Sequence, residues 1–95
     1  MLILGLARIE KDLKRNAAAR GPMRRWIEKV ESAQWQSIID VRRMFPTADA
    51  IKGTNLTCFN IGGNNYRLLT VIRYVMGEVE VRELLTHAEY SGKIS

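Results

Sequence analysis

The hydrophobic pattern of this sequence changes its period near residue 50, and this change restricts the chain to few folds. Before residue 46, apolar residues recur at intervals of three and four, as they do along one face of an α-helix. The helical stripes comprise Leu6, Ile9, Leu13 and Ala17, then Met23, Trp26, Ile27 and Val30, then Trp35, Ile38 and Ile39 with Arg42. After residue 55, the runs are rich in the β-branched and aromatic residues that favour strands. Helices followed by strands predict an α+β fold rather than an alternating α/β sheet.

Turn residues divide this pattern into expected elements. The apolar run at 2–4 predicts a short N-terminal strand, and two or three helices follow it. One helix is expected to begin at Pro22, and the last is expected to end before Pro46. Strands are expected at 56–61, 66–75 and 79–85, with turns at 62–65 and 76–78. Short turns between consecutive strands predict an antiparallel β-meander, and 95 residues fit a single domain spanning 1–95.

The net charge of +5 is unevenly distributed along the chain. Residues 1–30 carry eight basic and three acidic side chains, whereas residues 31–95 carry seven of each. A basic surface concentrated in one region suits a polyanion such as RNA, with Arg24, Arg25 and Lys29 as candidate contacts. The alternative is a solvated helix face that keeps a small protein in solution, and Trp26 and Trp35 are expected to pack in the core rather than to stack on RNA.

Several classes of protein are disfavoured by the same composition. The longest apolar stretch, near Met1–Leu6, is far shorter than a membrane span and lacks the flanks of a signal peptide, so no membrane partner is expected. A single cysteine, Cys58, cannot form an internal disulfide, which is typical of the reducing cytoplasm, and it is expected to be a small buried hydrophobe. One histidine and one cysteine cannot furnish a zinc site, so neither a metal nor a small-molecule cofactor is predicted.

One short polar segment and two arginines remain as candidates for chemistry. His87 is the only side chain whose ordinary pKa lies near neutrality, and Tyr90 follows three residues later. If the turn at Met76-Gly77 has two residues, Arg67 lies opposite Thr86, and Arg82 lies on the same face of the sheet. These groups together would form a phosphate site with proton-transfer groups. The alternative is that Arg67 pairs with a carboxylate and His87 caps the end of a strand.

Several segments, in order, resemble one known family. Phe59-Asn60-Ile61-Gly62-Gly63-Asn64-Asn65-Tyr66-Arg67-Leu68 resembles the F-N-[IV]-x-G-N-x-[YL]-R-[LV] segment of HigB toxins. Thr86-His87-Ala88-Glu89-Tyr90 resembles the T-H-x-E-Y ending of that family. Trp26, Trp35, Asp40-Val41 and Phe45-Pro46-Thr47-Ala48-Asp49 fit its upstream pattern. The start, Leu2-Ile3-Leu4-Gly5-Leu6, departs from the polar or basic first strand of many members.

The resemblance implies a fold, an activity and partners. HigB toxins are RelE-like toxins of type II toxin–antitoxin systems, with an N-terminal strand, two or three helices and an antiparallel sheet. The implied activity is an mRNA interferase, an endoribonuclease that cleaves mRNA in the ribosomal A site and so inhibits translation. The implied partners are mRNA, the ribosome and a HigA-type helix-turn-helix antitoxin.

The candidate residues can be assigned roles in such a reaction. RNA supplies its own nucleophile, the 2′-hydroxyl beside the scissile phosphate. We assign Arg67 and Arg82 to the phosphate, with Lys52 adding to them, and His87 and Tyr90 to proton transfer or base stacking. Neighbouring cations are expected to lower the pKa of Tyr90. Asn60 and Asn65 are expected to orient the turn or the RNA.

Two alternatives to this ribonuclease are considered. The chain could be a non-catalytic RNA- or ribosome-binding module that relies on the basic helices. A DNA-binding regulator is disfavoured, because no pair of helices joined by a short turn presents a polar recognition face.

Overall fold

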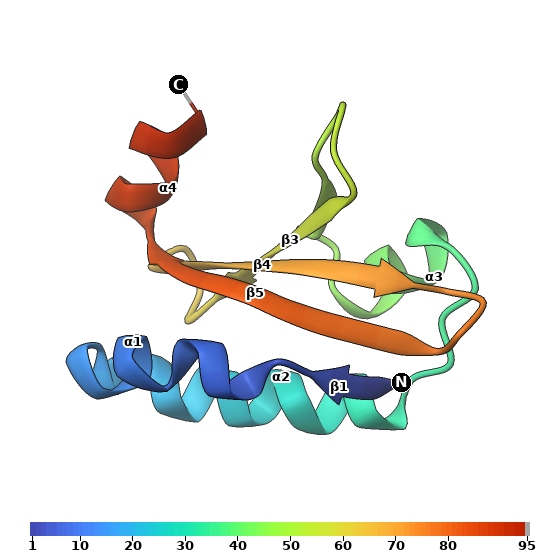
Figure 1. The fold of residues 1–95 in the computed structure, drawn as a ribbon, viewed down its shortest axis with the longest axis horizontal. Coiled ribbons are helices and arrows are strands. Elements are labelled where there is room, and N and C mark those ends of the chain that lie inside the picture. Colours follow the sequence, from blue (N-terminus) through green and yellow to red (C-terminus); the bar gives the residue numbers. More distant parts are fainter. Residues whose placement is uncertain (95) are drawn as a thin grey trace.

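Five strands form one mixed sheet in the order β1-β5-β4-β3-β2, as the computed structural model of residues 1–94 shows (Figure 1). The strands are β1 Leu2–Leu4, β2 Asp49–Ala50, β3 Leu56–Ile61, β4 Tyr66–Arg73 and β5 Glu78–Thr86. Strands β3, β4 and β5 make the expected antiparallel meander, β1 pairs with β5 in parallel, and β2 adds to the outer edge of β3. The α+β prediction is confirmed, and the two-residue strand β2 was not predicted.

Helical segments fill the chain before the meander, and one more follows it. They are the 3-10 helices η1 Leu6–Ile9 and η2 Ala17–Ala19 and the helices α1 Glu10–Arg15, α2 Arg20–Ser32, α3 Ile38–Met44 and α4 His87–Ile94. Helix α2 begins two residues before Pro22, where the prediction placed its start. Proline is tolerated there because the first N–H groups of a helix have no intrahelical partner. Helix α3 ends before Pro46 as predicted, and Ser37 caps its start.

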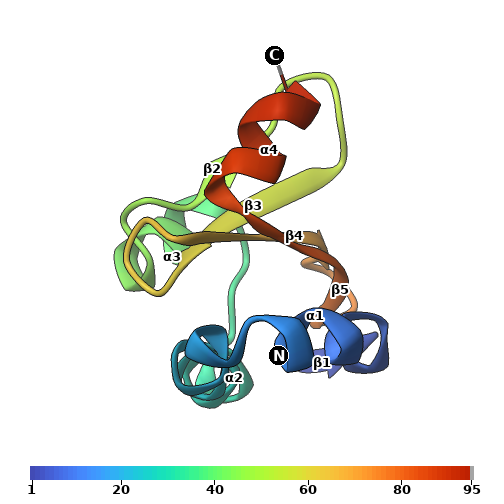
Figure 2. The same ribbon diagram turned by 90° about the vertical axis from the view of Figure 1, so that its left-hand side faces the viewer.

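The two faces of the sheet are covered differently. The layer formed by α1 and α2 lies against one face, and α4 rises from the opposite face (Figures 1 and 2). The core lies between the sheet and the layer formed by α1 and α2. Trp26, Trp35 and Phe59 are buried there, as predicted for both tryptophans. The predicted stripe of α3 is wrong at Ile39, which is 62% exposed, because Val41 is the residue that this short helix buries.

The register between β4 and β5 differs from the expected one. The connecting turn contains the four residues 74–77, so Arg73 faces Glu78, and Gly77 adopts a left-handed conformation with φ +70°. Farther along, Leu69 faces Glu83 while Thr70 faces Val81, which leaves Arg82 as the extra residue of a β-bulge. Arg67 therefore faces Leu85 rather than Thr86.

A sharp bend at Gly5 leads from β1 into η1. Gly5 has φ +81°, and a Cβ atom at this position would lie 2.6 Å from the backbone oxygen of Val81 on β5. This close approach lets η1 begin directly above β5. Any larger residue at position 5 must therefore push η1 away from the sheet.

We expect Gly5→Ala to destabilise the fold by roughly 1–3 kcal/mol from backbone strain, with a further cost from the contact with Val81. Urea denaturation followed by far-ultraviolet circular dichroism measures the loss. Gly53→Ala is the matched control, because Gly53 has φ +79° but nothing within 4 Å of the added Cβ. Equal losses in the two variants would show that the approach to Val81 is unimportant.

Candidate active site

The guanidinium of Arg67 is the centre of a polar cluster on the sheet face from which α4 rises. Alternation along β4 places the neighbouring Leu68 in the core and Arg67 on the other face, where its exposed fraction is only 9%. The Nη2 group donates to Asn64 Oδ1 at 2.6 Å and to His87 Nδ1 at 3.0 Å. The Nη1 group donates to the carbonyl oxygens of Asn64 at 3.1 Å and Tyr66 at 3.2 Å. One side chain thus ties the β3–β4 turn to helix α4.

Arg67 is held by neutral acceptors rather than by a carboxylate. None of the ion pairs found within residues 1–94 involves this side chain, so the alternative that Arg67 pairs with a carboxylate is wrong. The ring of Tyr90 lies 5.7 Å from Arg67 Cζ, in the range of a cation–π contact. A nearly buried cation without a negative partner is suited to attract an anion such as a phosphate.

Helix α4 brings His87 and Tyr90 to this cluster. Thr86 and Glu89 form a reciprocal capping box, with Glu89 N donating to Thr86 Oγ1 at 3.1 Å and Thr86 N donating to Glu89 Oε1 at 2.9 Å. The cap makes His87 the first helical residue, and a spacing of three puts Tyr90 on the same side of the helix. The strand expected at 79–85 is the last predicted element, so helix α4, which the capping box starts directly after β5, was not predicted.

The contact with Arg67 determines which tautomer of His87 fits this arrangement. A guanidinium has only donors, so Nδ1 must accept the hydrogen bond and the ring proton must lie on Nε2. The backbone N–H of His87 also donates to the carbonyl oxygen of Asn65 at 2.9 Å. The ring is exposed and can be reached by a substrate.

Tyr90 meets a less polar environment than expected. Burial is the main reason why the pKa of its hydroxyl lies above 10.0, and the adjacent Cys58 raises that pKa further, by charge and by a hydrogen bond. Asp49 also raises it, and only Arg67 opposes the shift. The expectation that neighbouring cations lower the pKa of Tyr90 is therefore wrong in direction. Cys58 is buried as predicted, and burial raises the pKa of its thiol.

The remaining predicted residues lie at different distances from the cluster. Asn60 faces Arg67 across the β3–β4 pair, and Asn65 contributes its carbonyl oxygen to His87. Arg82, at the bulge, donates to Glu80 at 3.4 Å rather than joining Arg67. Lys52 is exposed in the turn between β2 and β3, and none of the contacts of the cluster involves it.

Sequence reasoning missed three residues of the cluster: Asn64, Cys58 as a neighbour of Tyr90, and Asp49. Asn64 stands beside Asn65 in the turn, and only the structure shows which asparagine turns toward Arg67. Asp49 is the last residue of the Phe45–Asp49 motif, and it comes to the site because, in β2, it pairs with Cys58 of β3.

The basic residues predicted on α2 border a groove on the other side of the β3–β4 turn. Arg24, Arg25 and Lys29 are exposed, and the last two line a groove of about 250 Å³ together with Asn60 and the glycines of the β3–β4 turn. Lys29 also lies over the ring of Phe45, with Nζ 5.5 Å from its centroid. The turn that carries Asn64 therefore separates this groove from the Arg67 cluster.

Residues 1–94 contain neither a cluster of metal ligands nor a membrane-spanning helix. Within that range no group of three or more His, Cys, Asp or Glu side chains is placed to hold a metal ion. No helix in the same range has the length and apolar character needed to cross a bilayer.

A model of a known protein family matches most of the chain. Residues 19–93 match the family model HigB_toxin, described as the RelE-like toxic component of a toxin-antitoxin system. No curated protein matches the chain significantly. The matched range contains the whole Arg67, His87 and Tyr90 cluster.

The environment of Tyr90 predicts a specific loss of stability in alkali. The pKa of Tyr90 is raised above 10.0 in the folded state, so the tyrosine ionises at a lower pH in the unfolded chain. The contribution of Tyr90 to the free energy of unfolding is therefore complete below pH 10 and is lost as the pH rises above 10. We expect Tyr90→Phe to lose less stability than the unsubstituted chain between roughly pH 9 and pH 11. Urea denaturation at both pH values measures this difference, and Tyr74, whose pKa is also raised, is the same in both proteins. Equal losses would contradict a raised pKa of Tyr90.

Proposed function

The chain belongs to the HigB toxin family, the RelE-like toxic components of toxin–antitoxin systems, and on this premise we propose that its toxic activity is metal-independent cleavage of mRNA. The observation that carries the proposal is the Arg67 cluster. A nearly buried guanidinium, which pairs with no carboxylate of residues 1–94, contacts a histidine and a tyrosine on one exposed sheet face. Cleavage of RNA requires a cation for the phosphate and groups that move protons, and this cluster offers both.

The reaction can be written with the groups of this chain. The 2′-hydroxyl loses its proton to His87, the 2′-oxygen attacks phosphorus, and the bond from phosphorus to the 5′-oxygen breaks. The imidazolium of His87 returns the proton to the 5′-oxygen, so that one product ends in a 2′,3′-cyclic phosphate. Arg67 stabilises the additional negative charge on the phosphoryl oxygens.

Tyr90 and His87 have different parts in this scheme. A tyrosine whose pKa is raised keeps its proton near neutral pH, so Tyr90 acts as a hydrogen-bond donor to the phosphate and not as the base. When Arg67 turns from Nδ1 of His87 to the phosphate, Nδ1 is free to carry the ring proton. Nε2 then has a free lone pair and can act as the base. Substrate binding and activation of the base are thereby coupled through Arg67.

Other parts of the proposal concern location and partners. We propose that the protein acts in the cytoplasm on ribosome-bound mRNA, with Arg24, Arg25 and Lys29 docking on ribosomal RNA. Arg82 and Lys52 are proposed to contact the RNA beyond the scissile phosphate. The partner that restrains the toxin is proposed to be a HigA-type helix-turn-helix antitoxin.

A non-catalytic RNA- or ribosome-binding module is the alternative. It is favoured by the hydrogen bonds of Arg67 to Asn64, Tyr66 and His87, because these would join the β3–β4 turn to α4 whether or not RNA is cleaved. Such a module would inhibit translation by occupancy and would leave the RNA intact.

We expect Arg67→Lys and His87→Gln to relieve the growth arrest caused by expressing the chain. Lysine keeps the charge but cannot span Asn64 and His87 with one planar group, so the rate of cleavage should fall roughly 10²–10³-fold. Loss of the base in His87→Gln should reduce the rate roughly 10²–10⁴-fold. Single-turnover cleavage of mRNA on purified ribosomes measures both effects.

Arg43→Lys is the control, since Arg43 is an exposed arginine of α3 outside the cluster. If His87→Gln is folded, fails to cleave and still arrests growth fully, the non-catalytic alternative is correct. If it cleaves at the original rate, His87 is not the base.

Cleavage should continue in an excess of a metal chelator, because the scheme uses only side chains of the protein and the 2′-hydroxyl of the RNA. The products should carry a 2′,3′-cyclic phosphate or a 3′-phosphate, which mass spectrometry of the cleaved fragments identifies. Loss of cleavage with chelator and recovery with a divalent ion would contradict the metal-independent scheme.

A further inference from the structure

Three arginines from three separate elements converge on one carboxylate, Glu80 of β5. Arg8 of η1 donates to Glu80 at 2.6 Å, Arg73 of β4 at 2.6 Å and Arg82 of β5 at 3.4 Å. The side chain of Glu80 is only 15% exposed, whereas all three arginines retain much more access to solvent. The carboxylate is therefore enclosed by the guanidinium groups that it holds.

The cluster carries more positive than negative charge. Glu78, 3.8 Å from Arg73, is the only other acidic residue that forms an ion pair with these arginines in the part of the chain that the structure describes. Hydrogen bonds from Arg73 and then from Arg8 lower the pKa of Glu80 to about 2, so this carboxylate is charged at neutral pH. Three cations and two anions leave a positive patch on the exposed sheet face.

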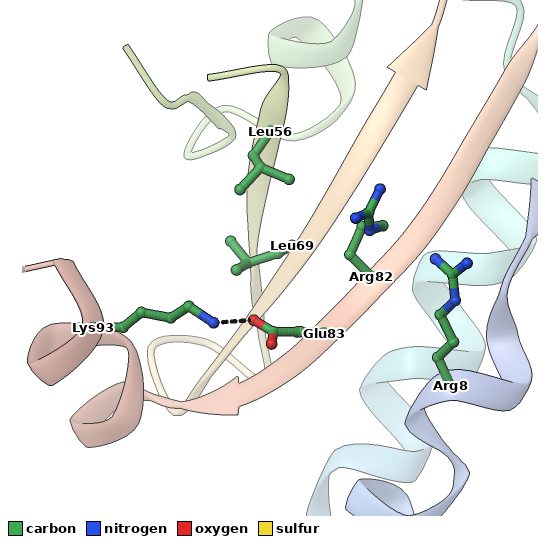
Figure 3. A pocket seen from close by; sticks show the side chains of 6 residues that line it. All are labelled: Arg8, Leu56, Leu69, Arg82, Glu83 and Lys93. Atoms are coloured by element: carbon green, nitrogen blue, oxygen red, sulfur yellow. Dashed lines mark hydrogen bonds and ion pairs between the residues drawn. The ribbon is translucent and has the colours of Figure 1, made fainter. Parts of the chain in front are cut away.

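A groove of about 440 Å³ lies beside this patch (Figure 3). Leu56 and Leu69 line it from β3 and β4, while Arg8 and Arg82 form one rim. Lys93 of α4 closes the other rim and is paired with Glu83 at 2.6 Å (Figure 3). Leu56 is half-buried, whereas Leu69 is 2% exposed and forms the floor of the groove. An apolar side chain between cationic rims suits a nucleotide, because the base can pack on Leu56 while the phosphate meets the arginines.

The groove is adjacent to the Arg67 cluster. Leu69 stands two residues after Arg67 on β4 and so faces the same side of the sheet. Helix α4 borders both places, since His87 at its start contacts Arg67 and Lys93 near its end lines the groove. A single strand bound at Arg67 would therefore continue into the groove.

We propose that this groove binds the phosphodiester backbone of single-stranded RNA, and that Glu80 is a built-in counter-ion that holds Arg8, Arg73 and Arg82 in place until a phosphate competes for them. The proposal rests on the proposed ribonuclease function, since it extends the substrate beyond the scissile phosphate. It predicts opposite effects on RNA affinity for substitutions of Glu80 and of the three arginines. Removing an arginine should weaken RNA binding, whereas neutralising Glu80 should strengthen it.

The probe is a short 2′-O-methyl RNA, which the proposed reaction cannot cleave because its 2′-oxygen carries a methyl group. Fluorescence anisotropy over a salt series gives its Kd. We expect Arg8→Gln and Arg73→Gln each to weaken binding and to reduce the salt slope by about 0.7 log units, the value for one phosphate contact on a single strand. Glu80→Gln should bind more tightly than the unsubstituted chain.

Two variants serve as controls. Arg43→Gln removes an exposed arginine that is also ion-paired, to Asp40 on α3, and it should bind almost as the unsubstituted chain does. Arg8→Lys keeps the charge and should restore most of the binding lost in Arg8→Gln. Circular dichroism confirms that each variant is folded before its Kd is compared.

The proposal is wrong if Arg8→Gln and Arg73→Gln bind the probe as tightly as Arg43→Gln does. It is also wrong if Glu80→Gln weakens binding as much as the two arginine substitutions do. In the second case the carboxylate and the arginines form a structural network only. Cleavage on the ribosome separates this result from failure of the proposed function. A chain that cleaves mRNA but fails the anisotropy test disproves the groove alone. A chain that passes the anisotropy test but never cleaves RNA disproves only the ribonuclease.

Discussion

The packing of Phe59 decides which residues reach the functional face of the sheet. Its ring centroid lies 5.4 Å from that of Trp26, 6.1 Å from that of Trp35 and 5.2 Å from that of Phe45, so three separate segments hold it in the core. Because side chains alternate along a strand, Cys58 is turned to the opposite face, toward Tyr90. A shift of β3 by one residue would place a polar side chain in the core and turn Cys58 away from Tyr90. The core therefore specifies the site without touching any substrate.

The second constraint is that one guanidinium joins segments distant in sequence. Arg67 binds both the side chain and the backbone of Asn64, and through His87 it also binds the start of α4. The backbone of His87 is tied to the same turn through Asn65. The turn and the helix can hardly move independently, which fixes the histidine next to the cation. The same contacts occupy the Nη1 and Nη2 groups, so a phosphate that binds either group has to displace at least one of them.

The sequence predicted the layout better than the local geometry. Period and turn residues sufficed for β1, for the helices before the sheet, for the meander and for the buried tryptophans. Strand β2 has only two residues, too few for any period to appear. Helix α4 could have been found, because Thr86 and Glu89 have the spacing of a capping box. The bulge at Arg82 could not, since alternation alone does not show where a strand carries an extra residue.

The same limit applies to charge. Summed along the sequence, all net positive charge lies in residues 1–30, which suggests that docking and chemistry occupy separate parts of the molecule. The fold removes this separation, because Arg8 contacts Glu80 on β5, 72 residues later in the chain, and Lys29 borders a groove formed with the β3–β4 turn. The local field depends on how many carboxylates lie within reach of each cation, not on the segment that supplies it. Arg67, which pairs with no carboxylate in residues 1–94, and the arginines that share Glu80 come mostly from the part of the chain whose net charge is zero. These residues make the sheet face positive where the sequence total indicates neutrality.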